Sequence, residues 1–431
     1  MTALRLSRGP AFGIVAVAIG LAACGGNAEE RSVTLAWDHP NVVSYWNGVA
    51  NRTVNATSAV GITSEEQRPA YQADLATVHV AIYDATSAID GRYRPYAVTP
   101  ITPAGGASLE AAASTAAYRV LRTLFPGRGV QYEAAYEARI AGVPMGDAKT
   151  RGLAIGEEVA AGILALRAND GRMVAPAPYV STTEPGRFRT ASPQPFNHHV
   201  PFMRPFSLNR LDQFRPAGPP RLDSAAYAAS LDETRVAGGM VSGVRTPEQL
   251  ETARFHTEAP AVFVTRNLGR FAASTADVAD AARLMAFIYV VHADAIGACF
   301  EAKYFYKTWR PLHAIPLADG DGNASTTADA AWTPVLPTPN HPEYPAAHSC
   351  TAGGLAETLR QVYGTRQVTY SFDSLVTRTT RTYAGIDALS EESRLARIHG
   401  GMHFDFSTTD GVALGTAVAR WVGAHHFGPR L

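Results

Sequence analysis

The segment KYFYKTWRP (residues 303–311) carries two cations seven residues apart in a run crowded with aromatic side chains. If this segment is helical, Lys303 and Arg310 lie on one face, because seven steps of about 100° return to within ~20° of the start. Two cations on one helix face usually mark a solvated surface. The aromatic residues between them disfavour a solvated position, so the pair is a candidate anion site.

A second segment, PAAH (residues 345–348), has the composition of a helix start beside a bound anion. Proline suits the first turn of a helix, where its missing N–H is not needed. The free N–H groups that follow can donate to an anion, and the small side chains of Ala346 and Ala347 let it approach the backbone. His348 would then serve as a general acid or base, although a lone histidine at a helix start is more often a capping or surface residue.

The third segment is RIHGGMH (residues 397–403). Its two adjacent glycines are expected to break the helix, which turns His403 out of the helical track. Arg397 supplies a third cation, and its forked guanidinium suits an oxyanion. His403 is a candidate nucleophile or metal ligand.

In this order the three segments resemble the signature shared by vanadium-dependent haloperoxidases and type-2 phosphatidic acid phosphatases. That signature is Lys-x6-Arg-Pro, then Pro-Ser-Gly-His, then Arg followed six residues later by His. The resemblance to the bacterial haloperoxidase branch covers most of the chain. It is carried by WNGVANRTV (46–54), LATVHVAIYDATSAIDG (75–91), PFSLNRLDQFRPAGPPRL (205–222) and HPEYPAAHS (341–349).

The resemblance implies a vanadate cofactor, with hydrogen peroxide and halide as substrates. Lys303, Arg310 and Arg397 then match residues that bind the oxygens of vanadate, together with the backbone at Ala346 and Ala347. His403 matches the axial ligand of vanadium, and His348 matches the histidine that handles the peroxide protons.

The chain departs from this pattern where Ala346 replaces the usual Ser and Ala347 replaces Gly. The lost hydroxyl corresponds to a charged hydrogen bond worth roughly 1.5–3 kcal/mol, so weaker oxyanion binding is expected. By resemblance, His341 and Phe300 belong to the halide pocket. His341 stands where chloroperoxidases have Phe and algal bromoperoxidases have His, which favours bromide over chloride.

The pattern of the mature chain is mostly helical, and the resemblance implies an all-α fold of two bundles joined by a long Pro-rich loop. Strands are hard to find. We expect bundles over residues 37–240 and 241–431, the second carrying the oxyanion site, with the irregular loop at 171–223. Helices are expected near residues 70–89, 108–125, 130–142, 147–167 and 225–237, then from 274 toward 310, from 345, and after 407–410 to 425.

Composition excludes some functions. The 431 residues include 38 Lys and Arg against 38 Asp and Glu, so the chain has no net charge and no basic field for nucleic acid. An anion site must therefore be built locally.

The first 23 residues have the pattern of a secretory signal peptide. Leu-Ala-Ala precedes Cys24 and resembles the lipobox of bacterial lipoproteins, in which that cysteine is acylated. We therefore expect a lipid anchor at Cys24, a tether over residues 24–36, and a location in the bacterial cell envelope. No later stretch approaches the ~20 apolar residues of a membrane span. Whether Cys299 and Cys350 form a disulfide stays open at this point.

Two other functions stay open beside the haloperoxidase. An acid phosphatase would use the same residues, with His403 as the nucleophile of a phospho-histidine intermediate and His348 protonating the leaving group. A non-catalytic oxyanion-binding lipoprotein is suggested by Ala346, but binding alone does not need both His348 and His403.

Overall fold

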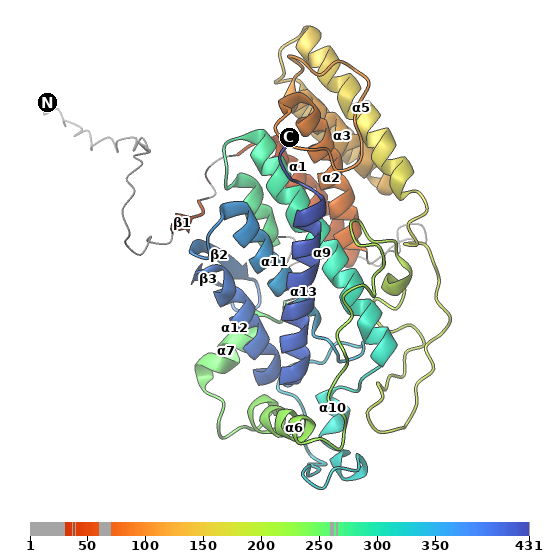
Figure 1. Ribbon diagram of the computed structural model, residues 1–431, viewed down its shortest axis with the longest axis vertical. Coiled ribbons are helices and arrows are strands. Elements are labelled where there is room, and N and C mark those ends of the chain that lie inside the picture. The colour runs from red at the N-terminus through yellow and green to blue at the C-terminus, as the bar shows by residue number, and fades with distance from the viewer. Residues whose placement is uncertain are drawn as a thin grey trace, which may run out of the picture.

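The computed structural model describes residues 31–36, 38, 40–59, 70–258, 263 and 266–430. The predicted signal peptide and Cys24 lie outside these residues. The described chain is mostly helical, as expected, and a small sheet lies beside the helices (Figure 1).

Among the described residues, the first half of the chain supplies five helices: α1 (Val42–Ala59), α2 (Tyr71–Asp90), α3 (Leu109–Leu124), α4 (Gly129–Ile140) and α5 (Asp147–Arg167). The last four lie where the periodicity predicted helices. Helix α5 packs closely on α3 because glycines face the contact. A Cβ atom at Gly156 would lie 2.6 Å from the carbonyl oxygen of Ala112, so a side chain there would force the helices apart.

The second half contains α6 (Ala225–Gly238), α7 (Pro247–Phe255), α9 (Val278–Tyr306), α10 (Pro311–Ala314), α11 (Ala347–Tyr363), α12 (Ile386–His399) and α13 (Asp405–His425). Short 3-10 turns lie at Pro126–Arg128, Val200–Phe202, Gly269–Ala273 and Ala318–Gly320. Helix α9 crosses the molecule and packs on α2, α11 and α13 (Figure 1). One hydrophobic core therefore continues through both halves of the chain.

Helix α9 is long and apolar enough to cross a membrane by length and composition, contrary to our expectation that no stretch after the signal peptide would be. In the structure, 94% of that apolar window is buried against other parts of the protein. Burial on all sides explains its apolar composition, because such a helix has no solvent-facing stripe.

The strands that were hard to find in the sequence form one small sheet. Strands β1 (Val33–Thr34), β2 (Val368–Ser374) and β3 (Thr379–Ala384) form a sheet in the order β1-β2-β3, with β1 parallel and β3 antiparallel to β2. The side chains of β2 alternate between buried and half-buried positions. This period-two pattern in VTYSFDS was the available signal. Strand β1 also shows that the end of the predicted tether is part of the folded body.

Three expected helix starts and one helix end are shifted. Helix α9 begins after Asp277, which caps it by accepting from the N–H of Asp280, and it ends at Tyr306 because Lys307 adopts a left-handed conformation (φ 55°). Helix α11 begins at Ala347, two residues after Pro345. Helix α13 begins at Asp405, ahead of the expected residues 407–410.

The Pro-rich segment 171–223 is mostly irregular and runs alongside α9 (Figure 1). Asp294 of α9 anchors it, because this buried carboxylate accepts three backbone N–H groups from residues 206–208 at 2.7–3.0 Å. Asp294 therefore holds this loop against α9. Phe188 is buried, whereas Phe196 is 61% exposed, so the aromatic side chains of the loop pack only in part.

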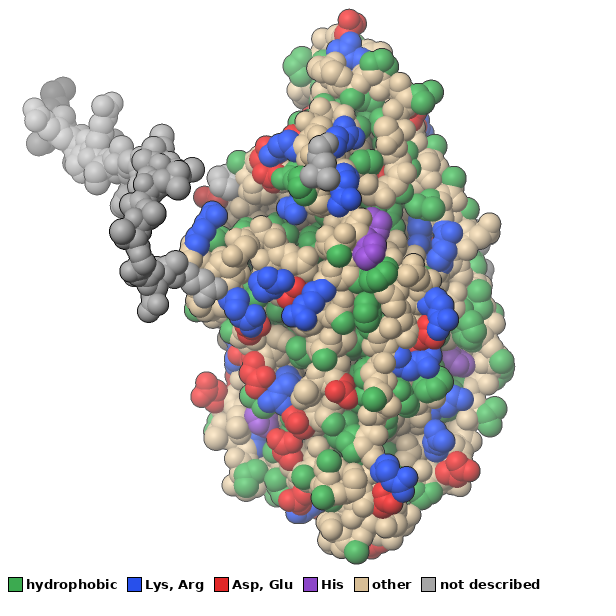
Figure 2. All heavy atoms as spheres, in the orientation of Figure 1, with side chains coloured by type: hydrophobic (Ala, Val, Ile, Leu, Met, Phe, Trp, Pro, Cys, Tyr) green, Lys and Arg blue, Asp and Glu red, His purple; other side chains and the backbone are tan. Residues whose placement is uncertain are grey.

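On the face drawn in Figure 2, Lys and Arg side chains lie interspersed with Asp and Glu. No single sign of charge dominates this face, in keeping with the absence of net charge.

Candidate active site

The predicted cations come together in the C-terminal half from three separate elements. Lys303 lies in the last turn of α9, Arg310 is the residue before α10, and Arg397 lies in the last turn of α12. Each is at most 1% exposed. The expectation that Lys303 and Arg310 share one helix face is wrong, because α9 ends between them and the tertiary fold brings them together.

The cluster has more buried positive charge than negative charge. Among the described residues, Glu343 is the carboxylate that interacts with Lys303 and Arg310. Burial lowers the pKa of Arg310 to about 10, and burial together with Arg310 lowers the pKa of Arg397 to about 9. Burial and the neighbouring arginines also lower the pKa of Lys303. Buried charges require partners, so this surplus favours a bound anion.

Backbone carbonyl groups hold two of the cations in place. The Nζ atom of Lys303 donates to the carbonyl oxygens of Pro342 (3.0 Å) and Glu343 (2.8 Å). The Nε atom of Arg310 donates to the carbonyl oxygen of His341 (2.9 Å), and its Nη1 atom donates to that of Met402 (2.8 Å). These contacts position the cations without neutralising them.

Arg397 is held less completely. Its Nη1 atom donates to the carbonyl oxygen of His256 at 2.8 Å, and its Nη2 atom lies 2.6 Å from the sulfur of Met402. Its buried Nε atom has no hydrogen-bond partner among the described residues. A buried donor without an acceptor is rare in native structures and is a second indication that an anion belongs here.

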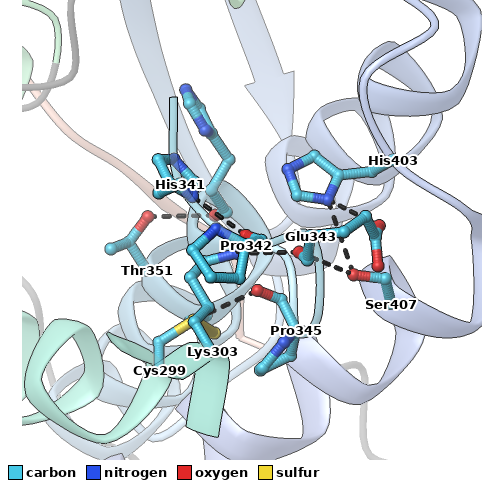
Figure 3. The surroundings of a disulfide bond; sticks show 11 residues. Cys299, Lys303, His341, Pro342, Glu343, Pro345, Thr351, His403 and Ser407 are labelled. Carbon is cyan, nitrogen blue, oxygen red and sulfur yellow. Dashed lines mark hydrogen bonds and ion pairs between the residues drawn. A yellow bond between two sulfur atoms is a disulfide. The ribbon is translucent and has the colours of Figure 1, made fainter. Parts of the chain in front are cut away.

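His403 follows the glycines after α12, as the sequence predicted, and is 2% exposed. Glu343 orients its ring: Oε1 accepts from Nδ1 of His403 at 2.8 Å and from the N–H of Phe404 at 3.1 Å (Figure 3). With the proton on Nδ1, the lone pair of Nε2 faces Nη1 of Arg310, 2.8 Å away. The unprotonated nitrogen of His403 therefore points into the cation cluster, where it accepts from Arg310.

Glu343 was missed from the sequence, although it lies within the quoted segment HPEYPAAHS. Burial raises its pKa to about 7. Nothing in the local pattern connects it with His403, because the two residues are 60 positions apart. A carboxylate that fixes the tautomer of a histidine is the usual partner of a metal-binding or nucleophilic imidazole.

The PAAH segment forms the N-terminus of α11. Ala346 is fully buried, and its N–H donates to the carbonyl oxygen of Ser407 at 3.0 Å. No side chain caps this helix, so the N–H groups of Ala347 and His348 lack acceptors within it. His348 interacts electrostatically with Arg397 and Lys303, and burial together with Arg397 lowers its pKa.

His341 and Phe300 lie together beside the cations. Their ring centroids are 5.1 Å apart in an edge-on arrangement, and Nζ of Lys303 lies 5.9 Å from the centroid of the Phe300 ring. The Nδ1 atom of His341 lies 2.9 Å from Nη2 of Arg310. Burial and Arg310 lower the pKa of His341, which keeps this imidazole neutral beside the cations.

With this geometry established, comparison with known proteins places the fold. Residues 283–427 match the family model described as "VCPO second helical-bundle domain". A solved structure described as the first bacterial vanadium-dependent iodoperoxidase aligns with a TM-score of 0.71 and 23% identity, covering 89% of this chain and 96% of that one. The chain has the fold of the vanadium haloperoxidases.

A second solved structure of this fold, a holo-type bacterial vanadium-dependent chloroperoxidase, aligns with a TM-score of 0.66 and 16% identity, covering 90% of this chain and 98% of that one. No protein with a curated description matches the chain by sequence. The resemblance inferred from the three motifs is thus confirmed at the level of the vanadium haloperoxidase fold.

The residues that this vanadium haloperoxidase fold gathers suit vanadate. The described residues contain no group of three or more His, Cys, Asp or Glu side chains that could hold a bare metal ion. Vanadate does not need one, because it is an oxyanion that cations and backbone N–H groups can bind through its oxygens. The orphaned Nε of Arg397 and the unprotonated Nε2 of His403, which faces Arg310, fit such a group.

A disulfide joins Cys299 to Cys350, which answers the question that the sequence left open (Figure 3). Both cysteines are fully buried. The bond connects α9, which carries Lys303, to the first turn of α11, which carries His348. It thereby links two of the elements that build the candidate site.

Proposed function

We propose that this protein is a vanadium-dependent haloperoxidase that oxidises halide with hydrogen peroxide to hypohalous acid. The observation that carries the proposal is the surplus of buried positive charge around Nε2 of His403. Lys303, Arg310 and Arg397 are at most 1% exposed, and Glu343 is the carboxylate that interacts with the first two. The vanadium haloperoxidase fold supports the choice of vanadate as the anion.

Each residue has a role in this proposal. Lys303, Arg310 and Arg397 bind the oxygens of vanadate and disperse their negative charge. His403 offers the Nε2 lone pair as the ligand, and Glu343 keeps the proton on Nδ1. When bound, vanadate supplies a Lewis acid that activates the peroxide.

His348 moves the peroxide protons. Its pKa is lowered by burial and by Arg397, so its imidazole is neutral at neutral pH and can accept a proton on a ring nitrogen. The same ring can later return that proton to the leaving oxygen. The free N–H groups at the start of α11 lie beside it and can donate to an oxygen of the anion.

For the halide, we propose bromide in preference to chloride, on the basis of His341. A neutral imidazole held between Arg310 and Phe300 provides one polar and one apolar wall. Oxidation of bromide and chloride by the wild type and by His341→Phe compares the two residues found at this position in the resembling families. A fall in the ratio of bromide to chloride turnover in the variant supports the assignment, and an unchanged ratio contradicts it.

The alternative is an acid phosphatase, because the same cations fit phosphate equally well. The His403–Glu343 pair would then activate Nε2 as the nucleophile, and His348 would protonate the leaving group. A non-catalytic oxyanion-binding protein is a weaker alternative, because binding alone does not require both His348 and His403.

Parallel assays of the purified protein separate these functions. Vanadate-loaded and vanadate-free protein are tested for bromide oxidation by hydrogen peroxide and for hydrolysis of p-nitrophenyl phosphate. Lys303→Met should abolish whichever activity the wild type has, whereas Lys307→Met, at an exposed position four residues away, is the matched control. Phosphatase activity without vanadate, together with no peroxidation by the loaded protein, would overturn the haloperoxidase proposal.

We also propose that acylated Cys24 anchors the protein in the cell envelope. The support is the Leu-Ala-Ala-Cys sequence after an apolar segment. Cys24→Ser should move the protein from the membrane fraction to the soluble fraction. Cys350→Ser, which removes a buried cysteine of the disulfide, is the control for the loss of a cysteine. Retention of the Cys24→Ser variant in membranes would contradict the anchor.

A further inference from the structure

Met402 brings a thioether sulfur into contact with the cation cluster. Its side chain is buried, and Nη2 of Arg397 donates to the sulfur at 2.6 Å. The carbonyl oxygen of Met402 accepts from Nη1 of Arg310 at 2.8 Å, and the next residue in the chain is His403. Met402 therefore contacts two of the residues proposed to bind vanadate. The chemistry proposed above does not use its sulfur.

A thioether is a poor partner for a buried guanidinium group. Its sulfur is only a weak acceptor of hydrogen bonds. Of the other two nitrogens of Arg397, Nη1 donates to the carbonyl oxygen of His256, and Nε has no partner among the described residues. An oxygen atom bonded to the sulfur of Met402 would give Arg397 a stronger acceptor than the sulfur itself.

Other methionines of the chain lie in different surroundings. Three of them are exposed at the surface, namely Met145, Met173 and Met240. Met285 is buried near the start of α9, at the opposite end of that helix from Lys303. An oxidant that arrives from bulk solvent meets the exposed methionines first. An oxidant that forms at the cation cluster arises beside Met402.

We propose that Met402 is a modification site, at which hypobromous acid formed at the cluster oxidises the thioether to a sulfoxide. The inference rests on the proposed function, because that function supplies the oxidant. In this step the sulfur–oxygen bond forms as the oxygen–bromine bond of hypobromous acid breaks. The sulfur loses two electrons, the bromine leaves as bromide, and the hydroxyl proton goes to the solvent.

The sulfoxide changes the anion site through Arg397. Its oxygen accepts a charge-assisted hydrogen bond from Nη2 of Arg397, the nitrogen that now donates to the sulfur. It thereby competes with an oxygen of vanadate for the same guanidinium group. The oxidised protein should therefore bind vanadate less tightly than the unmodified protein. Turnover is then limited by the oxidant that it produces.

Peptide mass spectrometry separates oxidant made by the protein from oxidant in the solvent. Vanadate-loaded protein is sampled during turnover of bromide and hydrogen peroxide, with peroxide alone as the blank. The same loaded protein, without peroxide, is treated with hypobromous acid added to the solvent. Turnover should convert Met402 to the sulfoxide before Met145, whereas the added reagent should oxidise Met145 before Met402.

Two leucine variants connect the modification with the loss of activity. Met402→Leu removes the reactive sulfur, so under turnover it should keep its own initial rate for longer than the wild type does. Met285→Leu is the matched control, because it removes a buried methionine far along α9 from the cluster. Its rate should decline as the rate of the wild type does.

Met402→Gln tests the effect on Arg397 without any oxidation. Its amide oxygen stands in for the sulfoxide oxygen, so vanadate should bind about tenfold more weakly to Met402→Gln than to Met402→Leu, whose side chain offers no acceptor. Vanadate titration of the two purified variants measures this difference, and circular dichroism checks that both are folded. Equal affinities would overturn the competition for Arg397.

The outcomes separate this inference from the proposed function. If bromide is oxidised while Met402 stays a thioether, the modification site is wrong and the haloperoxidase proposal stands. If the loaded wild type does not oxidise bromide, the haloperoxidase proposal fails, and the oxidation of Met402 fails with it. The mass spectrometry needs no variant, so it decides the question even if Met402→Gln does not fold.

Discussion

The carboxylate of Glu343 accepts a hydrogen bond from Nδ1 of His403 at 2.8 Å, although the two residues are 60 positions apart. With the proton on Nδ1, Nε2 of His403 is an acceptor that faces Nη1 of Arg310 inside a cluster of buried cations. A carboxylate in this position is the usual partner of a metal-binding or nucleophilic imidazole. The relationship joins the loop before α11 to the loop before α13, so it exists only in the folded protein.

Replacing Glu343 with Gln should weaken vanadate binding by about 10–100-fold, because the amide no longer fixes the proton on Nδ1. Vanadate titration of the purified variant measures this effect. Ser407→Ala is the matched control, since the Ser407 hydroxyl lies 3.5 Å from the same Nδ1 atom and holds it only weakly. Equal vanadate affinity in Glu343→Gln and the wild type would contradict an orienting role.

Substitution of His403 and substitution of His348 should have different effects on vanadate binding and turnover. His403→Ala should abolish vanadate retention and peroxidation together, because the ligand is gone. His348→Ala should keep vanadate bound but lower turnover by the ~10²–10⁴-fold typical of a lost general acid or base. Vanadate content and bromide oxidation are measured on the same samples. Loss of vanadate from His348→Ala would show that His348 holds the anion instead of moving protons.

Ala346→Ser should tighten vanadate binding by about tenfold, equivalent to roughly 1.4 kcal/mol, because it restores a hydroxyl beside the N-terminus of α11. The comparison is the dissociation constant of vanadate for the variant and the wild type. Ala356→Ser adds a hydroxyl to the same helix far from the site and serves as the control. No gain in Ala346→Ser would mean that its hydroxyl caps the helix and does not reach the anion.

Acid should destabilise the protein in part through His79. This histidine is fully buried, and burial lowers its pKa to about 3. In the unfolded chain the His79 ring binds a proton near pH 6.5, whereas in the folded protein it stays neutral down to about pH 3. The contribution of neutral His79 to the free energy of unfolding is therefore fully present above pH 6.5. It falls by about 1.4 kcal/mol per pH unit as the pH drops from 6.5 toward 3. Urea unfolding at several pH values should show a shallower acid slope for His79→Phe, with His425→Phe as the control at an exposed position. Parallel slopes for His79→Phe and the wild type would contradict this assignment.

Removal of the disulfide should lower the free energy of unfolding by about 4 kcal/mol, the chain-entropy value for a loop of 51 residues. The double variant Cys299→Ala, Cys350→Ala is compared with the wild type by denaturant unfolding. In the presence of a reducing agent, the free energies of unfolding of the two proteins should differ less. A difference below about 1 kcal/mol would mean that the helix packing alone specifies this arrangement.

Local patterns were sufficient for most helices of the first half. Residues 70–89 and 147–167 carry apolar side chains at helical spacing, and helices α2 and α5 form there. The glycines after Arg397 end α12 as predicted, because Gly401 adopts a positive φ of 72°. A local signal was also present for strand β2, although it was not used, since VTYSFDS has the two-residue alternation of a strand.

Sequence by itself determined the residue types of the candidate site and their internal spacing, because the three motifs are short and contiguous. Tertiary structure decided how these residues meet. Lys303 and Arg310 come together although α9 ends between them, and Glu343 reaches His403 from a distant part of the chain. Backbone propensities act over a few residues, whereas such contacts depend on the packing of whole helices and on the burial of charge, which no local pattern encodes.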